Sequence, residues 1–133
     1  MPPLLSYFYV AMGGALGSVT RFWLAAFVTE RAGGLFPWGT LVVNVTGSFA
    51  IGFLATISGP YGRSGMVARF QEFFMIGICG GYTTFSAFSL QTLSLTQQGE
   101  LWKAAANILL SVAVCLIAVW LGHLLAVSTG AKR

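Results

Sequence analysis

The sequence predicts an all-α membrane protein whose four transmembrane helices form a single domain over residues 1–133. Of its residues, 56% are hydrophobic and 8% are charged, whereas soluble domains carry about 25% charged residues. A helix needs roughly 20 apolar residues to cross a bilayer, and four segments of the chain meet this requirement. We expect the spans at residues 4–28, 39–58, 70–96 and 101–127.

Turn-forming residues separate these spans. Residues 31–37 contain two glycines and a proline, residues 59–62 contain a Gly-Pro pair, and residues 97–100 contain a glycine after two glutamines. Such clusters end helices and form connections. The chain holds no internal repeat of useful length, so we expect one small helical bundle.

The third span is predicted to be broken near its middle. Residues 77–88 read GICGGYTTFSAF, and this stretch gathers glycine and threonine, which are poor helix formers, at membrane depth. Lipid supplies no water to freed backbone groups, so an open helix is tolerated only inside protein or along a wet path. Phe85 and Phe88 follow at positions i and i+3, and so share one helix face beside the break. Taken alone, these two rings also fit ordinary core packing.

Small and polar residues recur at four-residue spacing on three spans. Such residues let helices approach closely, and an intramembrane Asn often serves as interhelical glue worth about 0.6–2 kcal/mol. Packing and the lining of an ion path are both open interpretations of these residues. The three sets are Gly13 and Gly17, then Thr40, Asn44, Ser48 and Gly52, and finally Asn107, Ser111 and Cys115.

Arg21 lies deep in the first span. A charged side chain at this depth must be paired, must snorkel to the interface or must face water. A structural role and a role in a vestibule both remain open for it.

Positive charges are almost evenly divided between the two sides of the membrane. The seven bases are scattered singly rather than in a stripe, which argues against nucleic-acid binding. By the positive-inside rule, balanced charges give little preference for one orientation. We therefore expect a dual-topology chain that can form an antiparallel homodimer, with a weakly biased single orientation as the alternative. One side carries Arg63, Arg69, Lys132 and Arg133, and the other carries Arg31 and Lys103, together with Arg21 if its side chain snorkels out of the first span.

The few acids exclude several function classes. Aspartate is absent, and Glu30, Glu72 and Glu100 lie in loops or at the start of a span. No acid pair, Cys/His cluster or base beside a nucleophile supports an enzyme. Proton-coupled transport needs an ionisable group at depth, and no carboxylate is found there. A narrow route lined by amides, hydroxyls and the positive edges of aromatic rings suits a small anion.

Three motifs resemble the CrcB/Fluc family of fluoride channels. They are GSVTR at residues 17–21, GTLVVNVTGSF at 39–49 and GICGGYTTFS at 77–86, and the likeness covers nearly the whole chain in the right order. The resemblance implies passive export of cytoplasmic fluoride by a multi-pass protein of the cell inner membrane, without enzymatic activity. It also implies two pores in an antiparallel dual-topology homodimer with a structural sodium ion at its centre. The implied partners are therefore fluoride, sodium, a second copy and the lipid bilayer, with no nucleic acid.

The resemblance also assigns site residues by motif position. It implies an anion pore containing Asn44, Phe85 and Phe88, and sodium bound by the backbone carbonyls of Gly80 and Thr83. Asn107 and Ser111 would form a polar track on the fourth span, which Cys115 would extend or end.

The chain departs from the family pattern at Gln91. The family usually has a glutamate there, so any role of that carboxylate in pore electrostatics or gating is in doubt for this chain.

Two other functions are weighed against a channel. A small dual-topology multidrug or cation exporter would need a carboxylate in the first span, where this chain has Arg21. A structural subunit of a larger membrane complex would use the polar stripes only for assembly, and would pass no ions.

Overall fold

The computed structural model describes residues 3–59 and 65–131. Part of the predicted charge balance rests on Arg63, Lys132 and Arg133, which lie outside the described residues together with most of the second predicted turn.

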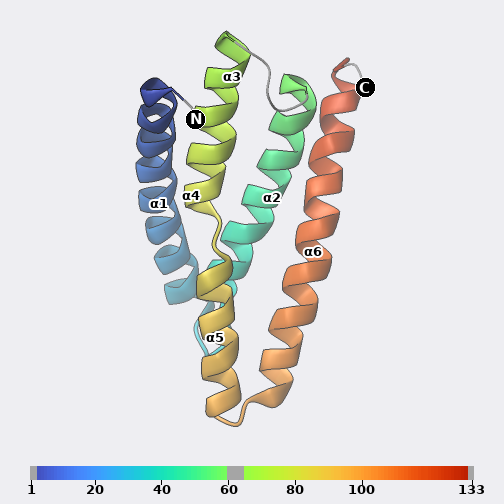
Figure 1. Ribbon diagram of the computed structural model, residues 1–133. Coiled ribbons are helices and arrows are strands. Elements are labelled where there is room, and N and C mark those ends of the chain that lie inside the picture. The colour runs from blue at the N-terminus through green and yellow to red at the C-terminus, as the bar shows by residue number, and fades with distance from the viewer. Residues whose placement is uncertain (1–2, 60–64, 132–133) are drawn as a thin grey trace.

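Among the described residues, four helical stretches are long and apolar enough to cross a membrane. They are α1 (Leu4–Ala32), α2 (Trp38–Ser58), the stretch Met66–Gln97 and α6 (Leu101–Ser128). The prediction of an all-helical, multi-pass membrane protein is therefore confirmed. The helices run alternately up and down, and the start of α1 and the end of α6 lie at the same end of the bundle (Figure 1).

The third stretch consists of several helical pieces. A short α3 (Met66–Phe70) leads into a π-helix, η1 (Gln71–Cys79), which is followed by α4 (Gly80–Tyr82) and α5 (Phe85–Gln97). Between α4 and α5, Thr83 has φ −84° and ψ 158°, and Thr84 has φ −152° and ψ 114°. Both residues are therefore extended, as Figure 1 shows between the ribbons of α4 and α5.

Glycines allow two pairs of helices to approach closely. The main contacts of α1 are with η1, and those of α2 are with α6. A Cβ atom added to Gly77 of η1 would lie 2.9 Å from the Cα of Gly13 in α1, and one added to Gly52 of α2 would lie 2.9 Å from the carbonyl carbon of Val119 in α6. At such distances only glycine fits, so these contacts fix how the helices pack.

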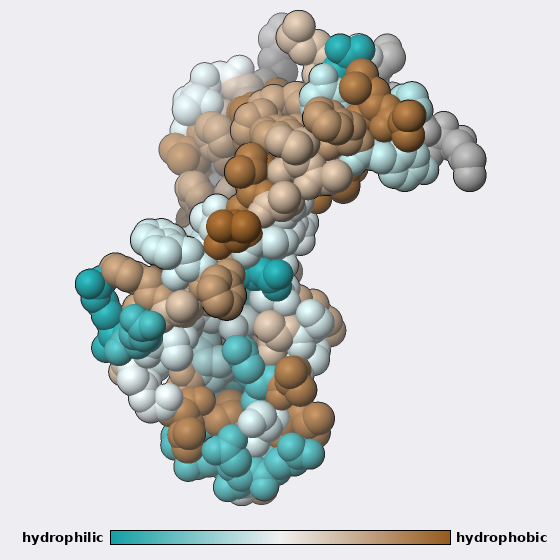
Figure 2. Space-filling view, turned by 90° about the vertical axis from the view of Figure 1, so that its left-hand side faces the viewer, coloured by the Kyte–Doolittle hydropathy of each residue, from teal (hydrophilic) through white to brown (hydrophobic). Residues whose placement is uncertain are grey.

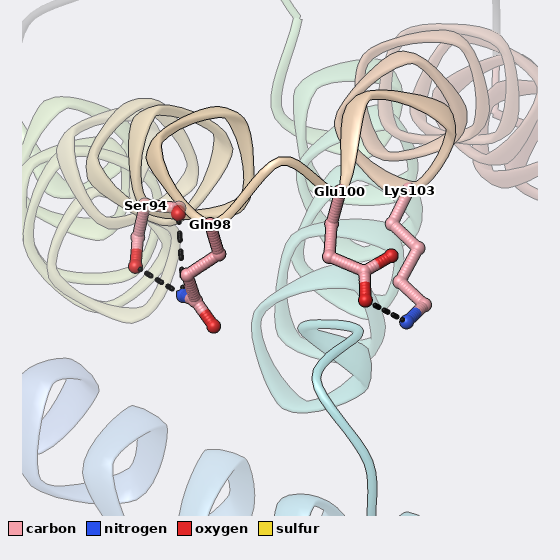
Figure 3. Close-up of polar contacts among 4 residues, drawn as sticks. All are labelled: Ser94, Gln98, Glu100 and Lys103. Carbon is pink, nitrogen blue, oxygen red and sulfur yellow. Dashed lines mark hydrogen bonds and ion pairs between the residues drawn. The ribbon is translucent and has the colours of Figure 1, made fainter.

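A tight connection joins α5 to α6 (Figure 3). The side chain of Gln98 donates hydrogen bonds to the carbonyl oxygen of Ser94 at 3.2 Å and to its hydroxyl at 3.0 Å. Lys103 pairs with Glu100 at 3.0 Å on the first turn of α6. Both interactions are local, one at the end of α5 and one at the start of α6, and the two helices also contact each other.

Much of the protein surface is apolar. Phe22, Phe85 and Leu109 expose 80%, 78% and 70% of their surfaces. In Figure 2, hydrophobic residues cover most of the upper part of the face shown, and hydrophilic ones gather at the lower end. An apolar surface of this extent is suited to lipid or to another protein rather than to water.

Candidate functional site

An amide of α2 ends the helical hydrogen bonding before α5. The N–H of Thr83 still makes the regular helical bond to the carbonyl of Cys79, at 3.0 Å. The next N–H, that of Thr84, donates instead to Oδ1 of Asn44 at 2.8 Å, and Nδ2 of Asn44 donates to the carbonyl of Thr84 at 3.0 Å. The backbone of Thr84 is thus held at two points by one side chain.

Thr84 also begins α5. Its hydroxyl oxygen accepts the N–H of Ala87 at 3.1 Å, which is the bond of a helix N-cap. The Thr84 side chain is 8% exposed, and its hydroxyl lies 3.3 Å from that of Ser86. Thr84 therefore serves both as the partner of Asn44 and as the first anchor of the next helix.

These contacts redirect two backbone donors. In a continuous α-helix, the N–H of Thr84 would bind the carbonyl of Gly80, and the N–H of Ala87 would bind that of Thr83. Both N–H groups donate elsewhere. The hydroxyl of Thr83 donates to the carbonyl of Cys79 at 2.8 Å, so it does not satisfy either oxygen. The carbonyls of Gly80 and Thr83 are consequently open to other ligands.

A cavity of about 420 Å³ lies beside this interruption. The ring centroids of Phe85 and Phe88 in its wall are 5.4 Å apart, with the ring planes inclined by 45°. Phe88 is 9% exposed, whereas Phe85 is 78% exposed, so only the first is covered within one copy of the chain. The predicted site residues that line this cavity are Asn44, Gly80, Thr83, Phe85, Phe88 and Ser111, and Cys79 and Cys115 line it as well.

Asn107 lies outside that lining, although it is connected to it. Its side chain is 1% exposed and accepts a hydrogen bond from Ser111 at 3.3 Å. It donates to the hydroxyl of Thr92 at 2.9 Å, and Thr92 donates to the carbonyl of Phe88 at 2.8 Å. Asn107 thus joins α6 to the backbone that carries Phe88.

Arg21 and Gln91 line a different cavity, of about 440 Å³, between α1, α2 and α5. Within the described residues, Oε1 of Gln91 is buried without a hydrogen-bond partner, and Arg21 has no ion-pair partner. Thr40 and Thr84 also line this cavity, and Thr84 lines the first one too. Thr84 therefore separates the two spaces.

Two residues of this site are absent from the sequence-based prediction. Thr84 appears there only within the stretch of poor helix formers at residues 77–88, and Thr92 does not appear. The cap signal of Thr84 was available, since a threonine just before a helix commonly caps it. Nothing in the sequence pairs Thr92 with Asn107, because that contact depends on the packing of α5 against α6.

Side-chain metal ligands do not gather here. Over the described residues, no three His, Cys, Asp or Glu side chains come together in a way that could hold a metal ion.

Comparison with known proteins gives one family match and several close relatives. The model of the family described as CrcB-like protein, Camphor Resistance (CrcB), matches residues 8–123. Proteins named fluoride-specific ion channel FluC from Rhodospirillum rubrum and Methylocella silvestris are 57% and 53% identical to the chain, over 92% and 93% of its length and 95% of theirs. The protein of the same name from Opitutus terrae is 55% identical over 96% of both chains.

Proposed function

Because the chain belongs to the CrcB-like protein family, we propose that it is a fluoride-specific ion channel that lets cytoplasmic fluoride leave the cell passively. The observation that carries this proposal is 57% identity over 92% of the chain to a protein with that name. The four apolar helical stretches and the cavity beside the interruption in the third of them agree with it. Channels are not enzymes, and we assign this chain no catalytic residue.

We place the anion route along the cavity that contains Asn44, Phe85, Phe88 and Ser111. A dehydrated anion needs donors and weak polar contacts at several successive sites. The Thr84 N–H binds Oδ1 of Asn44, which fixes the orientation of the amide. Since an amide nitrogen carries two hydrogens and Thr84 takes one, the other is available to an anion. The positive ring edges of the two phenylalanines would supply the next contacts.

Asn107 does not line this route, but it holds residues that do. Its hydrogen bonds to Ser111 and Thr92 hold one residue of the cavity wall and the helix turn that carries Phe88. Arg21 and Gln91 would act at the second cavity, where the guanidinium raises the local positive potential.

The proposed assembly is an antiparallel, dual-topology homodimer in the cell inner membrane, with one pore per copy. Gly80 is exposed in the single copy, and its helical N–H partner donates elsewhere. At membrane depth such a carbonyl must be covered by protein or must line a wet path. A second copy would cover it, together with the 78% of Phe85 that one copy leaves exposed.

A structural sodium ion fits the centre of this dimer. Carbonyl oxygens are suitable ligands for a hard monovalent cation, and those of Gly80 and Thr83 have lost their helical donors. When bound, the ion would offset the repulsion between carbonyls that face each other across the dimer axis. Because the backbone supplies these ligands, the side chain at position 83 matters little to them.

The alternatives predict different behaviour. A multidrug or cation exporter is disfavoured because the first span carries Arg21 instead of an acid. A structural subunit of a membrane complex would pass no ion alone. Purified protein in liposomes loaded with potassium fluoride should release fluoride when valinomycin balances the charge, while chloride-loaded liposomes retain chloride. Protein that is correctly assembled and releases no fluoride would refute the channel.

A further inference from the structure

The bond between Asn44 and Thr84 has a consequence for the carbonyl of Gly80. Helical bonding is regular up to the N–H of Thr83, which donates to Cys79 at 3.0 Å. The next N–H along the chain is that of Thr84, and in an unbroken helix it would donate to the carbonyl oxygen of Gly80. Oδ1 of Asn44 takes it instead, at 2.8 Å. Asn44 and the Gly80 carbonyl are therefore competing acceptors for one hydrogen.

We infer that Asn44 is the positioning residue of the cation site, in addition to its place beside the anion route. It keeps the Gly80 oxygen free by holding the Thr84 N–H, and it does so without touching the cation. This inference rests on the proposed function, which assigns sodium to the carbonyls of Gly80 and Thr83.

The shape of the contact supports this role. Asn44 both accepts from and donates to the backbone of Thr84, which has the extended angles φ −152° and ψ 114°. An uncharged side chain with an acceptor and a donor side by side is a carboxamide. Gly47, one turn along α2, brings the two segments together, since a Cβ there would lie 3.0 Å from Cδ1 of Tyr82. The pair of hydrogen bonds between Asn44 and the backbone of Thr84, here called the clamp, therefore depends on the packing of α2.

Removing the clamp should weaken cation binding. Without Asn44, the Thr84 N–H can return to the Gly80 carbonyl and extend α4 by one helical bond. That oxygen would then accept a hydrogen bond from the Thr84 N–H and be less available to a cation. Sodium would have to break this bond in order to bind.

The test measures sodium binding through stability rather than through flux. A ligand that binds only the folded state raises the free energy of unfolding by RT ln(1 + [L]/Kd), so the dependence of the unfolding temperature on sodium concentration gives the half-saturating concentration. The purified full-length protein is unfolded thermally in detergent at increasing sodium chloride, with N-methyl-D-glucamine chloride keeping ionic strength constant. We expect the half-saturating sodium concentration to rise about tenfold in Asn44→Leu, which corresponds to about 1.4 kcal/mol.

Two further variants separate this role from others. Asn44→Asp keeps an oxygen for the Thr84 N–H and loses the amide donor, so its sodium response should remain near that of the wild type while fluoride flux falls. Asn107→Leu removes an amide that is 1% exposed and that, among the described residues, bonds to the side chains of Thr92 and Ser111. It should lower the unfolding temperature and leave the half-saturating sodium concentration unchanged.

Three results would overturn the inference. They are an unchanged half-saturating concentration in folded Asn44→Leu, an equal shift in Asn107→Leu, and loss of the sodium response in Asn44→Asp. If Asn44→Leu does not fold, loss of the sodium response in Asn44→Asp still refutes the inference. A wild-type protein with no sodium response would refute the cation site and this inference together, whereas a wild-type protein that binds sodium and passes no fluoride would refute only the channel.

Discussion

Asn107 of α6 donates a hydrogen bond to the hydroxyl of Thr92 in α5 over 2.9 Å, and this single contact ties the fourth span to the helix that carries Phe88. The hydroxyl of Thr92 in turn donates a hydrogen bond to the carbonyl oxygen of Phe88 at 2.8 Å. A buried amide on α6 is thus connected by two hydrogen bonds to the backbone of a residue whose ring lines the cavity.

The first prediction concerns this connection. Thr92→Val keeps the shape of the side chain and leaves the Asn107 amide with an unmatched N–H. Losing a buried hydrogen-bond partner costs about 1–3 kcal/mol. We expect a lower unfolding temperature and reduced fluoride flux. Thr96→Val is the matched control, since its exposed hydroxyl donates to the carbonyl of Thr92 within α5. Equal stability and flux in both variants would show that the connection has no effect.

The second prediction concerns the Phe88 ring, which is 9% exposed and lines the cavity. Phe88→Ala removes the ring edge that the anion is proposed to pass, so fluoride efflux from liposomes should fall about tenfold or more, equal to about 1.4 kcal/mol. The dimer should still elute normally from a sizing column.

Phe8→Ala is the control for that variant. Phe8 is 59% exposed on α1 and does not line either cavity described above. Its loss should not change flux. If Phe88→Ala conducts as well as Phe8→Ala, the ring serves only to pack the helix.

The third prediction compares two neighbouring glycine contacts between α1 and η1. An alanine at Gly77 would place its Cβ 2.9 Å from the Cα of Gly13, whereas an alanine at Gly14 would meet its nearest atom at 4.0 Å. Overpacking costs about 1–3 kcal/mol. Gly77→Ala should therefore lower the unfolding temperature, and Gly14→Ala should leave it unchanged or raise it slightly, because alanine favours helix. The reverse order would mean that α1 and η1 pack differently.

The fourth prediction concerns orientation. Lysines added to the α5–α6 connection beside Lys103, or near Arg69 on the opposite side, should bias insertion in opposite directions. Each biased form should be inactive when expressed alone, and co-expression of the two should restore fluoride resistance to a sensitive strain. Full activity from one biased form would exclude the antiparallel dimer. Reporter fusions at the C-terminus would verify that each form has a single orientation.

The sequence by itself determined the four apolar stretches and the class of the protein. Hydrophobicity and turn residues act locally, so windows of about 20 residues carry enough information to place each span. The run from Gly77 to Phe88 was recognisable for the same reason, because its helix propensity is a property of the residues themselves.

The tertiary structure alone decided how the site is assembled. The sequence placed Asn44 among polar stripe residues, but only the packing of α2 shows that it holds the backbone of Thr84, 40 residues later. Likewise, Arg21 and Gln91 share one cavity while Asn44 and Phe88 share another. The physical reason is that a hydrogen bond requires two groups within about 3 Å. For residues distant in the chain, the close helix contacts permitted by Gly13, Gly47 and Gly77 set that distance.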